Sequence, residues 1–388
     1  MTHSRLALAA AAAACTLTVS QATPPSLPAF APAIARGGLV FVSGILPAPP
    51  VAAGFDAQAT QVLDELRRRL QAAGTSLDRV VSTSVYLASG SDFAALNTIW
   101  AKYWPSAPPA RTTIVAGLPV AGARIQVSAV AAAAETSRSV VLPRGWPGPS
   151  SPYSYAIRAG DTLFLSGLLP RRGADNTPVK GDIEAQTGAV FENADAVLAA
   201  AGFSLADVVS ARIFLTDGAV FERMNAAYRT RFMTDPPARA TVITPLPAPD
   251  ALIEITMVAV KGAGRAAVLT PGPDGAPGRP NPNLSSAIRT GPQLFLSGML
   301  GVLPANVSDA AGQTAETLNR LERTMTAAGF GWPEVADSVV YVTDMSAAPD
   351  VLRVFSARTG GRMPAGTIAG TGLVSPQGLV EIMLTAGK

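Results

Sequence analysis

The chain has 388 residues, which is too many for one typical hydrophobic core and favours two or three domains. Its 30 Lys and Arg residues against 27 Asp and Glu residues give a net charge of only +3, and no run of Lys or Arg is longer than Arg67–Arg69. This balance excludes the electrostatic footprint expected of a nucleic-acid partner or of binding to an anionic membrane.

Residues 1–22 come first in the chain and are predicted to be a secretion signal. His3 and Arg5 precede an Ala/Leu-rich run that is too short to span a membrane, and Ser20-Gln21-Ala22 is a small-x-small cleavage site. We therefore expect a periplasmic or secreted protein. As an alternative, Ala13-Ala14-Cys15 is a degenerate lipobox, and cleavage before Cys15 would leave a lipoprotein anchored through that residue.

The same segment holds the only His and the only Cys, His3 and Cys15. The processed protein would then lack both, apart from a lipidated Cys. This excludes Ser-His-Asp and Cys-His nucleophile systems, Cys/His zinc sites and disulfides. Any chemistry is expected to use carboxylates, Arg, Lys, Tyr, hydroxyls and backbone amides.

Three copies of one pattern follow the signal. Each copy begins with an apolar strand that ends in a Ser-Gly pair, continues into a helix with apolar residues at helical spacing, and reaches a Gly suited to a left-handed helix cap. The Ser-Gly pairs and capping glycines are Ser43-Gly44 with Gly74, Ser166-Gly167 with Gly202, and Ser297-Gly298 with Gly329. The interval from a shared Gln (Gln58, Gln186, Gln313) to the capping Gly is the same in all three copies.

Each copy then predicts a strand, a second helix and two short strands. The strands are expected at 80–87, 208–215 and 335–342, and the second helices at 93–104, 221–232 and about 351–357. Pro/Gly-rich stretches near 143–152 and 270–283 cannot be helix or central strand. We predict a β-β-α-β-α-β-β unit in each of three domains, residues 23–136, 137–263 and 264–388.

The motifs together resemble the RidA (reactive intermediate deaminase) family. They are Phe41–Gly44, the Ala-Ala-Gly-x-Ser-Leu-x-x-Val-Val run at 72–81, Asp92–Asn97, Pro109–Thr112 and Ile253–Ile255. That family forms homotrimers of a chorismate-mutase-like α/β (α+β) unit with ligand clefts between subunits. The resemblance implies that this one chain supplies all three units and closes into a monomeric, intramolecular pseudo-trimer.

The resemblance also implies a site. Family members hold a substrate carboxylate with the Arg of a Pro-Ala-Arg motif and use a Glu on the last strand, with a Tyr, a Ser-Gly pair and an Asn nearby. Repeat 2 has the whole set, which makes it the predicted active copy: Arg239, Glu254, Tyr153, Ser166, Gly167 and Asn225. Repeat 1 keeps Arg111, Ser43, Gly44 and Asn97, with Phe30 at the Tyr position and Gln126 at the Glu position. Repeat 3 keeps Ser297, Gly298 and Glu381, with Gly366 for the Arg and Leu284 for the Tyr.

These residue types suit hydrolysis of a small 2-imino or 2-enamino acid. Arg239, and Arg111 in repeat 1, offer a planar fork that matches a carboxylate. Glu254, if desolvated, has a raised pKa and passes protons between water and the leaving nitrogen. Ser166, Tyr153 and the Gly167 N–H are expected to polarise the attacked carbon or hold water. No metal or organic cofactor is required, and the expected partner is a small carboxylate-bearing ligand.

Several alternatives remain open at this point. Each residue has a structural reading: Arg239 as an ion-pair residue, Glu254 as the polar position of a half-exposed strand, and the Ser-Gly pairs as strand ends. The whole protein is alternatively a non-catalytic binder of small carboxylates, anchored by Arg111 and Arg239. A ribonuclease, the activity of some relatives, is disfavoured by the near-neutral charge and the absence of His. Finally, if clefts draw residues from adjacent repeats, the set in repeat 2 is divided between two clefts.

Overall fold

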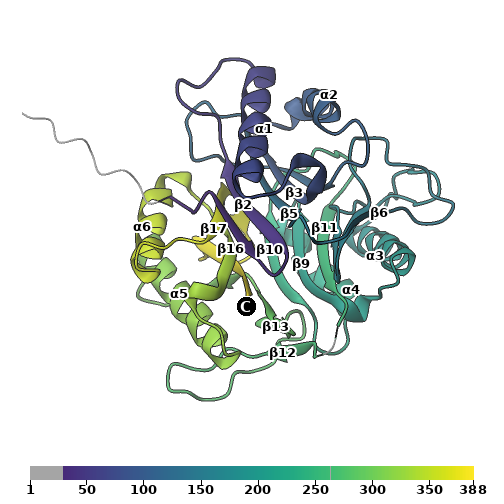
Figure 1. Cartoon of the computed structure of the whole chain (residues 1–388). Helices are drawn as coiled ribbons and strands as arrows, with labels where there is room; N and C mark the ends of the chain where they lie inside the picture. The colour runs from purple at the N-terminus through teal and green to yellow at the C-terminus, as the bar shows by residue number, and fades with distance from the viewer. Residues whose placement is uncertain (1–28, 263) are drawn as a thin grey trace, which may run out of the picture.

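The computed structural model describes residues 29–262 and 264–388. The predicted signal and lipobox, residues 1–22, lie outside the described residues. Three sheets gather at the middle of the molecule, and the helices of each repeat lie on its outer side (Figure 1). The fold is thus α+β, with three similar units closed into an intramolecular pseudo-trimer.

Repeat 1 has the predicted order β-β-α-β-α-β-β. Its elements are β1 (Ala33–Arg36), β2 (Leu39–Ile45), α1 (Phe55–Ala72), β3 (Val80–Leu87), α2 (Phe93–Tyr103), β4 (Ala110–Val115) and β5 (Ile125–Ala132).

Repeat 2 has the same order preceded by an additional edge strand. Its elements are β6 (Arg138–Val141), β7 (Ala156–Ala159), β8 (Thr162–Leu165), α3 (Ile183–Ala200), β9 (Val208–Leu215), α4 (Phe221–Arg229), β10 (Ala238–Ile243) and β11 (Ile253–Val260).

Repeat 3 also begins with an additional strand and has two two-residue strands. Its elements are β12 (Ala266–Val268), β13 (Ala287–Thr290), β14 (Gln293–Leu296), β15 (Met299–Leu300), α5 (Ala310–Ala327), β16 (Val335–Val342), α6 (Ala348–Arg358), β17 (Ala365–Gly370), β18 (Gly372–Leu373) and β19 (Val380–Gly387).

The seven-element prediction was therefore short by one strand in repeat 2 (β6) and by three in repeat 3 (β12, β15 and β18). The segments that join the repeats pair with the first hairpin, β6 with β7 and β12 with β13, and so cover an edge that the repeat alone would leave unpaired. The central strands β3, β9 and β16 have the bounds that the sequence predicted. The three second helices are confirmed, with ends shifted by a few residues.

One parallel pair gives each sheet its shape. In repeat 1 the strand order is β1-β2-β5-β3-β4, and β3 runs parallel to β4 while the other pairs are antiparallel. A parallel connection needs a crossover, which α2 provides. Repeats 2 and 3 pair β9 with β10 and β16 with β17 in the same way. The strand after the crossover, β4, β10 or β17, carries the Pro-Ala motif.

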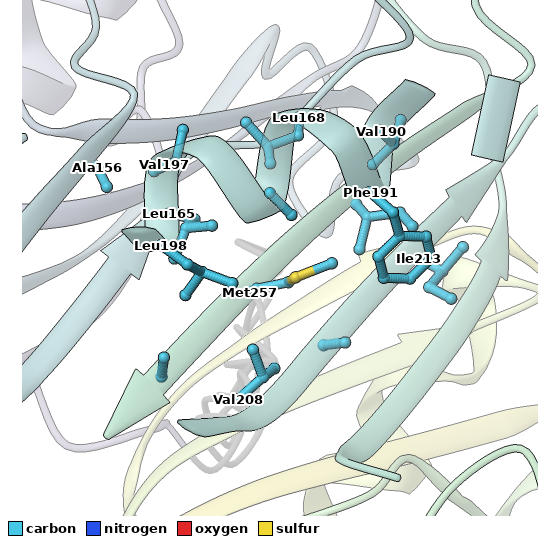
Figure 2. Close-up of a cluster of buried hydrophobic side chains, with 14 of the residues drawn as sticks. Ala156, Leu165, Leu168, Val190, Phe191, Val197, Leu198, Val208, Ile213 and Met257 are labelled. Carbon is cyan, nitrogen blue, oxygen red and sulfur yellow. The ribbon is translucent and has the colours of Figure 1, made fainter. Parts of the chain in front are cut away.

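A separate hydrophobic core holds each helix pair against its sheet. In repeat 2, Val190, Phe191 and Val197 of α3 pack on strand residues such as Ile213 and Met257 (Figure 2). The first helix of each repeat ends at the predicted glycine. Gly74, Gly202 and Gly329 all have φ of +76°, a backbone conformation that a side chain disfavours.

The three repeats also share a core at the centre. Tyr86, Phe214 and Tyr341 occupy the same position on β3, β9 and β16, and each is at most 1% exposed within one apolar cluster. The sheets are joined directly as well: β18 of repeat 3 pairs with β10 of repeat 2, and Gly117 of repeat 1 bridges Gly370 of repeat 3. Among the described residues, no helix has the length and apolar character needed to cross a membrane.

Candidate active site at the junctions between repeats

Each repeat meets the next through the start of its post-crossover strand. At the first junction, between repeats 1 and 2, the Arg111 backbone N–H donates to Ser166 Oγ at 2.9 Å, and Ser166 Oγ donates to the Ser154 carbonyl at 2.6 Å. The Gly167 N–H donates to the Arg111 carbonyl at 3.1 Å. These bonds fix the arginine-bearing strand of repeat 1 against the Ser-Gly pair of repeat 2.

The same contacts recur at the other two junctions. Between repeats 2 and 3, the Arg239 N–H donates to Ser297 Oγ at 2.8 Å, and the Gly298 N–H donates to the Arg239 carbonyl at 3.1 Å. Between repeats 3 and 1, the Gly366 N–H donates to Ser43 Oγ at 2.9 Å. We call these the second and third junctions.

The residue set of repeat 2 is therefore divided between two junctions. Arg239 and Asn225 belong to the second junction, whereas Ser166, Gly167, Tyr153 and Glu254 belong to the first. Of the two arrangements that the sequence left open, the structure has the shared one. The arginine that meets the Glu and Tyr of repeat 2 is Arg111 of repeat 1.

At the first junction, Arg111 is a buried cation with unfilled hydrogen-bonding capacity. Its side chain is 5% exposed, and Nη2 donates to Asn97 Oδ1 at 2.6 Å. Among the described residues Nη1 has no hydrogen-bond partner and the guanidinium has no salt bridge. Phe93 and Trp100 lie under the guanidinium at 5.6 and 5.3 Å. Burial lowers the pKa of Arg111 to about 10, against the opposing effect of Tyr153 and Glu254.

Glu254 faces this arginine from the last strand of repeat 2. Burial raises its pKa to about 8, while Arg111, Arg212 and the Thr113 backbone act to lower it. Burial also raises the pKa of Tyr153 to about 12. At neutral pH the phenol is therefore a proton donor, and the carboxyl group exchanges between its acid and base forms.

The glycine of the Ser-Gly pair makes room for the carboxyl group. A Cβ at Gly167 would lie 1.6 Å from Glu254 Oε1, and a Cβ at Gly298 would lie 1.9 Å from Glu381 Oε1. The predicted use of the Gly167 N–H to polarise a substrate is wrong for this structure, because that N–H is already bonded to the Arg111 carbonyl. Ser166 Oγ likewise serves the strand contact described above.

The second junction keeps the arginine and the glutamate but lacks the tyrosine. Arg239 is 2% exposed and lies 4.9 Å above the Tyr228 ring, and its Nε and Nη1 have no hydrogen-bond partner among the described residues. The same is true of both amide atoms of Asn225. Burial raises the pKa of Glu381 to about 8, with Arg239 opposing. Leu284 stands at the tyrosine position.

The third junction is closed. A Cβ at Gly366 would lie 2.6 Å from Phe30 Cδ1, so Phe30 fills the space where the arginine side chain would begin. The Phe30 ring meets Phe355 edge-on, with 6.2 Å between centroids. Gln126 replaces the glutamate, and its Oε1 is buried without a hydrogen-bond partner among the described residues.

Comparison with known proteins agrees with this threefold arrangement. The family model described as Endoribonuclease L-PSP matches residues 20–133, 145–261 and 276–388. The chain belongs to this family, as three tandem RidA-like domains.

Its relatives correspond to one domain each. A RutC family protein of Sulfurisphaera tokodaii is 47% identical over 117 residues, which is 30% of this chain and 93% of the relative. The 3-aminoacrylate deaminase RutC of Acinetobacter baylyi is 40% identical over 122 residues, 31% of this chain and 97% of the relative. A match to the solved structure of a chorismatase covers 80% of this chain and 93% of the chorismatase chain, with a TM-score of 0.51. The sequences are 18% identical, so this match shows a likeness of fold alone.

Two features of the RidA-like domains escaped the sequence analysis. The aromatic residues under the arginines, Trp100 and Tyr228, were not among the predicted site residues, although both lie 26 residues after the capping glycine. The shared Gln is a buried tie between the first helix and the loop before the last strand. Gln186, for example, donates to the Asp250 carbonyl at 3.0 Å and accepts from the Leu252 N–H at 2.7 Å.

No group of three or more His, Cys, Asp or Glu side chains is arranged to hold a metal ion in the part of the chain that the structure describes. The ionisable groups of the junctions are single arginines and glutamates on facing strands.

Proposed function

We propose that the protein hydrolyses small 2-imino and 2-enamino acids to 2-keto acids and ammonia in a cleft at the first junction. The observation that supports this is the meeting there of an unpaired buried guanidinium from one repeat and a carboxyl group with a pKa of about 8 from the next. Buried charges without partners are rare in structures that only need stability, and here a carboxylate ligand would complete them.

The first step is orientation of the substrate. Arg111 Nη1 is free to bind one carboxylate oxygen, and the stacked Phe93 and Trp100 rings together with Asn97 hold the guanidinium plane in place. A fixed planar fork sets the position of the adjacent imine carbon, which a flexible ammonium group would not do.

The second step is proton transfer. Water adds to the imine carbon, the C=N π electrons move to nitrogen, and Glu254 carries a proton from the water to that nitrogen. Glu254 then carries the hydroxyl proton of this carbinolamine to the nitrogen, the C–N bond breaks as the oxygen electrons form the carbonyl of the keto acid, and ammonia leaves. A pKa near the working pH makes both proton donation and acceptance accessible to Glu254. Tyr153, protonated throughout, donates a hydrogen bond to the developing charge.

For a 2-enamino acid, the neutral Glu254 first protonates the β-carbon, and the resulting carboxylate then takes a proton from the nitrogen, which gives the imine. One relative is named for 3-aminoacrylate, an enamine whose nitrogen is on the β-carbon. That compound would be protonated at the α-carbon and would give a 3-oxo acid, so it is a test substrate of a neighbouring class beside a 2-imino acid.

The second junction favours a different role. It holds Arg239 and Asn225 with unpartnered polar atoms but has Leu284 in place of the phenol. We propose that this junction binds small carboxylates with little or no turnover, which is the non-catalytic function considered for the whole protein.

Purified protein with freshly generated 2-imino acid tests the proposal. We expect faster keto-acid release than in buffer, and loss of this acceleration in Glu254→Gln. Glu381→Gln is the matched control, because it removes the equivalent carboxyl group of the second junction. Absence of any acceleration, together with tight binding of keto acids, would leave only the carboxylate-binding role.

We further propose that residues 1–22 direct export and that the mature protein is a monomer, since its three repeats already fill the positions of a trimer. Fractionation of cells that express the full chain tests export, with Cys15→Ser to separate a lipid anchor from simple secretion. Light scattering of the purified chain tests the monomer.

A further inference from the structure

A cavity lies away from the junctions, at the centre of the molecule. It is a cavity of about 110 Å³, and all three repeats line it. The central strands contribute equivalent positions to its wall: Ser82 and Ser84 of β3, Ser210 and Arg212 of β9, and Asp337 and Val339 of β16.

The cavity is closed at one end and open at the other. Two residues further along the same strands are Tyr86, Phe214 and Tyr341, which are almost completely buried in one apolar cluster and leave no opening on that side. At the other end the lining residues include the half-buried Arg36 and the exposed Lys388. A small solute therefore has a route from solvent to the inner wall.

Arg212 places in this wall a cation that has no salt bridge among the described residues. Its Nη2 donates to Ser84 Oγ at 3.0 Å, and it lies close to the phenols of Tyr86 and Tyr341. None of these groups carries a compensating charge. Among the described residues Arg212 has no salt bridge, although Asp337 lines the same cavity. Burial raises the pKa of Asp337 to about 7, so this carboxyl group is partly neutral at neutral pH.

The cation occurs at only one of the three equivalent positions. Its equivalents in the other two repeats are Ser84 and Val339, and the equivalents of Asp337 are Ser82 and Ser210. In a trimer of identical chains, an arginine at this position would occur three times around the axis, and the three charges would repel one another. One chain with three different repeats holds a single guanidinium there.

The surroundings favour an anion with a short apolar body. Three lining side chains are cationic (Arg36, Arg212 and Lys388), against one acidic side chain, Asp337. Arg36 Nε is buried without a hydrogen-bond partner among the described residues. The remaining wall combines hydroxyls with apolar side chains such as Phe41 and Phe164.

We propose that this central cavity is a second ligand site, which binds a small aliphatic monocarboxylate against Arg212. The guanidinium fork matches a carboxylate, and the volume sets the size of the body. A cavity of about 150 Å³ accommodates benzene, so the present one suits an acid of about two to four carbons. The assignment does not depend on deamination at the first junction.

Calorimetric titration with propionate tests the site. The starting protein carries Arg111→Met and Arg239→Met, which removes both junction arginines. We expect one propionate site per chain to remain, and adding Arg212→Met to weaken binding at least about tenfold. Arg158→Met, which removes one cation outside the cavity, is the control and should leave the affinity unchanged.

Ser210→Val provides a second variant, because it fills the cavity and keeps the arginine. It should also abolish propionate binding, and it decides the matter if the Arg212 variant does not fold. The proposal is overturned if the Arg111/Arg239 variant binds no propionate, in which case the cavity holds only water. It is equally overturned if Ser210→Val, or a folded Arg212→Met, binds propionate as well as the starting protein.

Discussion

Because the proposed site lies at the first junction, between repeats 1 and 2, Arg111 and Arg239 should contribute very differently to turnover. Arg111→Met should strongly impair deamination, whereas Arg239→Met, the same change at an equally buried position, should leave it within about threefold of the original. The distinction follows from position alone, because Arg111 faces Glu254 and Tyr153, while Arg239 faces Glu381 at a junction that has Leu284 at the tyrosine position.

The loss of activity expected for Arg111→Met can be calculated from the hydrogen bonds that Arg111 offers the substrate. Arg111 Nη1 is unpartnered and Nη2 already donates to Asn97, so the substrate gains one new charge-assisted bond and a share of a second. Each such bond contributes about 1.5–3 kcal/mol. A loss of about 3 kcal/mol corresponds to a decrease in kcat/KM of about 10²-fold.

The assay measures keto-acid release from a freshly generated 2-imino acid at several substrate concentrations. Urea denaturation of both variants supplies the folding control. We expect little change in stability, since replacing an unpaired buried charge with an apolar side chain of similar length is often neutral or stabilising. If Arg239→Met loses as much activity as Arg111→Met, or more, the assignment of the site to the first junction is refuted.

Three further predictions concern the residues around the site. The folded-state pKa of Glu254 is raised from 4.5 to about 8, so the folded protein binds one more proton than the unfolded chain between these pH values, and its stability falls as the pH rises through them. In urea titrations, Glu254→Gln should flatten this pH dependence by at most about 1.4 kcal/mol per pH unit. Gly167→Ala should displace the Glu254 carboxyl group and abolish activity. Gly44→Ala, which crowds Gln126 at the closed junction, should cost about 1–3 kcal/mol of stability but leave turnover unchanged. Equal activities of the two variants would contradict this. Gln186→Ala leaves the Asp250 carbonyl and the Leu252 N–H without their partner and should lower the free energy of unfolding by about 2 kcal/mol, and an unchanged denaturation midpoint would count against that role.

Much of the fold was accessible from the sequence because the three copies share their spacing. Local sequence patterns predict the strands at 80–87, 208–215 and 335–342 and the capping glycines. Because each pattern occurs three times at the same spacing, coincidence is an improbable explanation. The strands β6 and β12 were missed because they lie in connecting segments whose pairing is decided by an available sheet edge, not by their own pattern.

The site was only partly accessible, for a different reason. Sequence order shows which residues one repeat contains, but the junctions form between repeats. Arg111 and Glu254 are brought together by backbone contacts such as Gly167 N–H to Arg111 O, across a long stretch of chain. The ring pair under each arginine and the space that Gly167 provides are properties of packing, which residue types alone do not reveal.

The substitutions that made two repeats look degenerate fall mainly in one place. Phe30 and Gln126 of repeat 1 and Gly366 of repeat 3 all belong to the third junction, so these three losses close one site and leave two arginine–glutamate pairs intact. The second junction differs from the first chiefly at Leu284. This pattern indicates that in a fused chain the junction, and not the repeat, is the unit that keeps or loses a site.

Leu284→Tyr should therefore give the second junction its missing phenol. Leu284 stands 13 residues before Ser297, as Tyr153 stands before Ser166, and both side chains are half-buried, so the new ring has equivalent surroundings. In the Arg111→Met background we expect deamination to return to within about tenfold of the original, given that a positioned proton donor contributes about 10²–10⁴-fold. The recovered activity must disappear again with Arg239→Met or Glu381→Gln. Recovery that survives both changes, or a well-folded Leu284→Tyr variant that shows no recovery, would mean that the phenol is not what separates the two junctions.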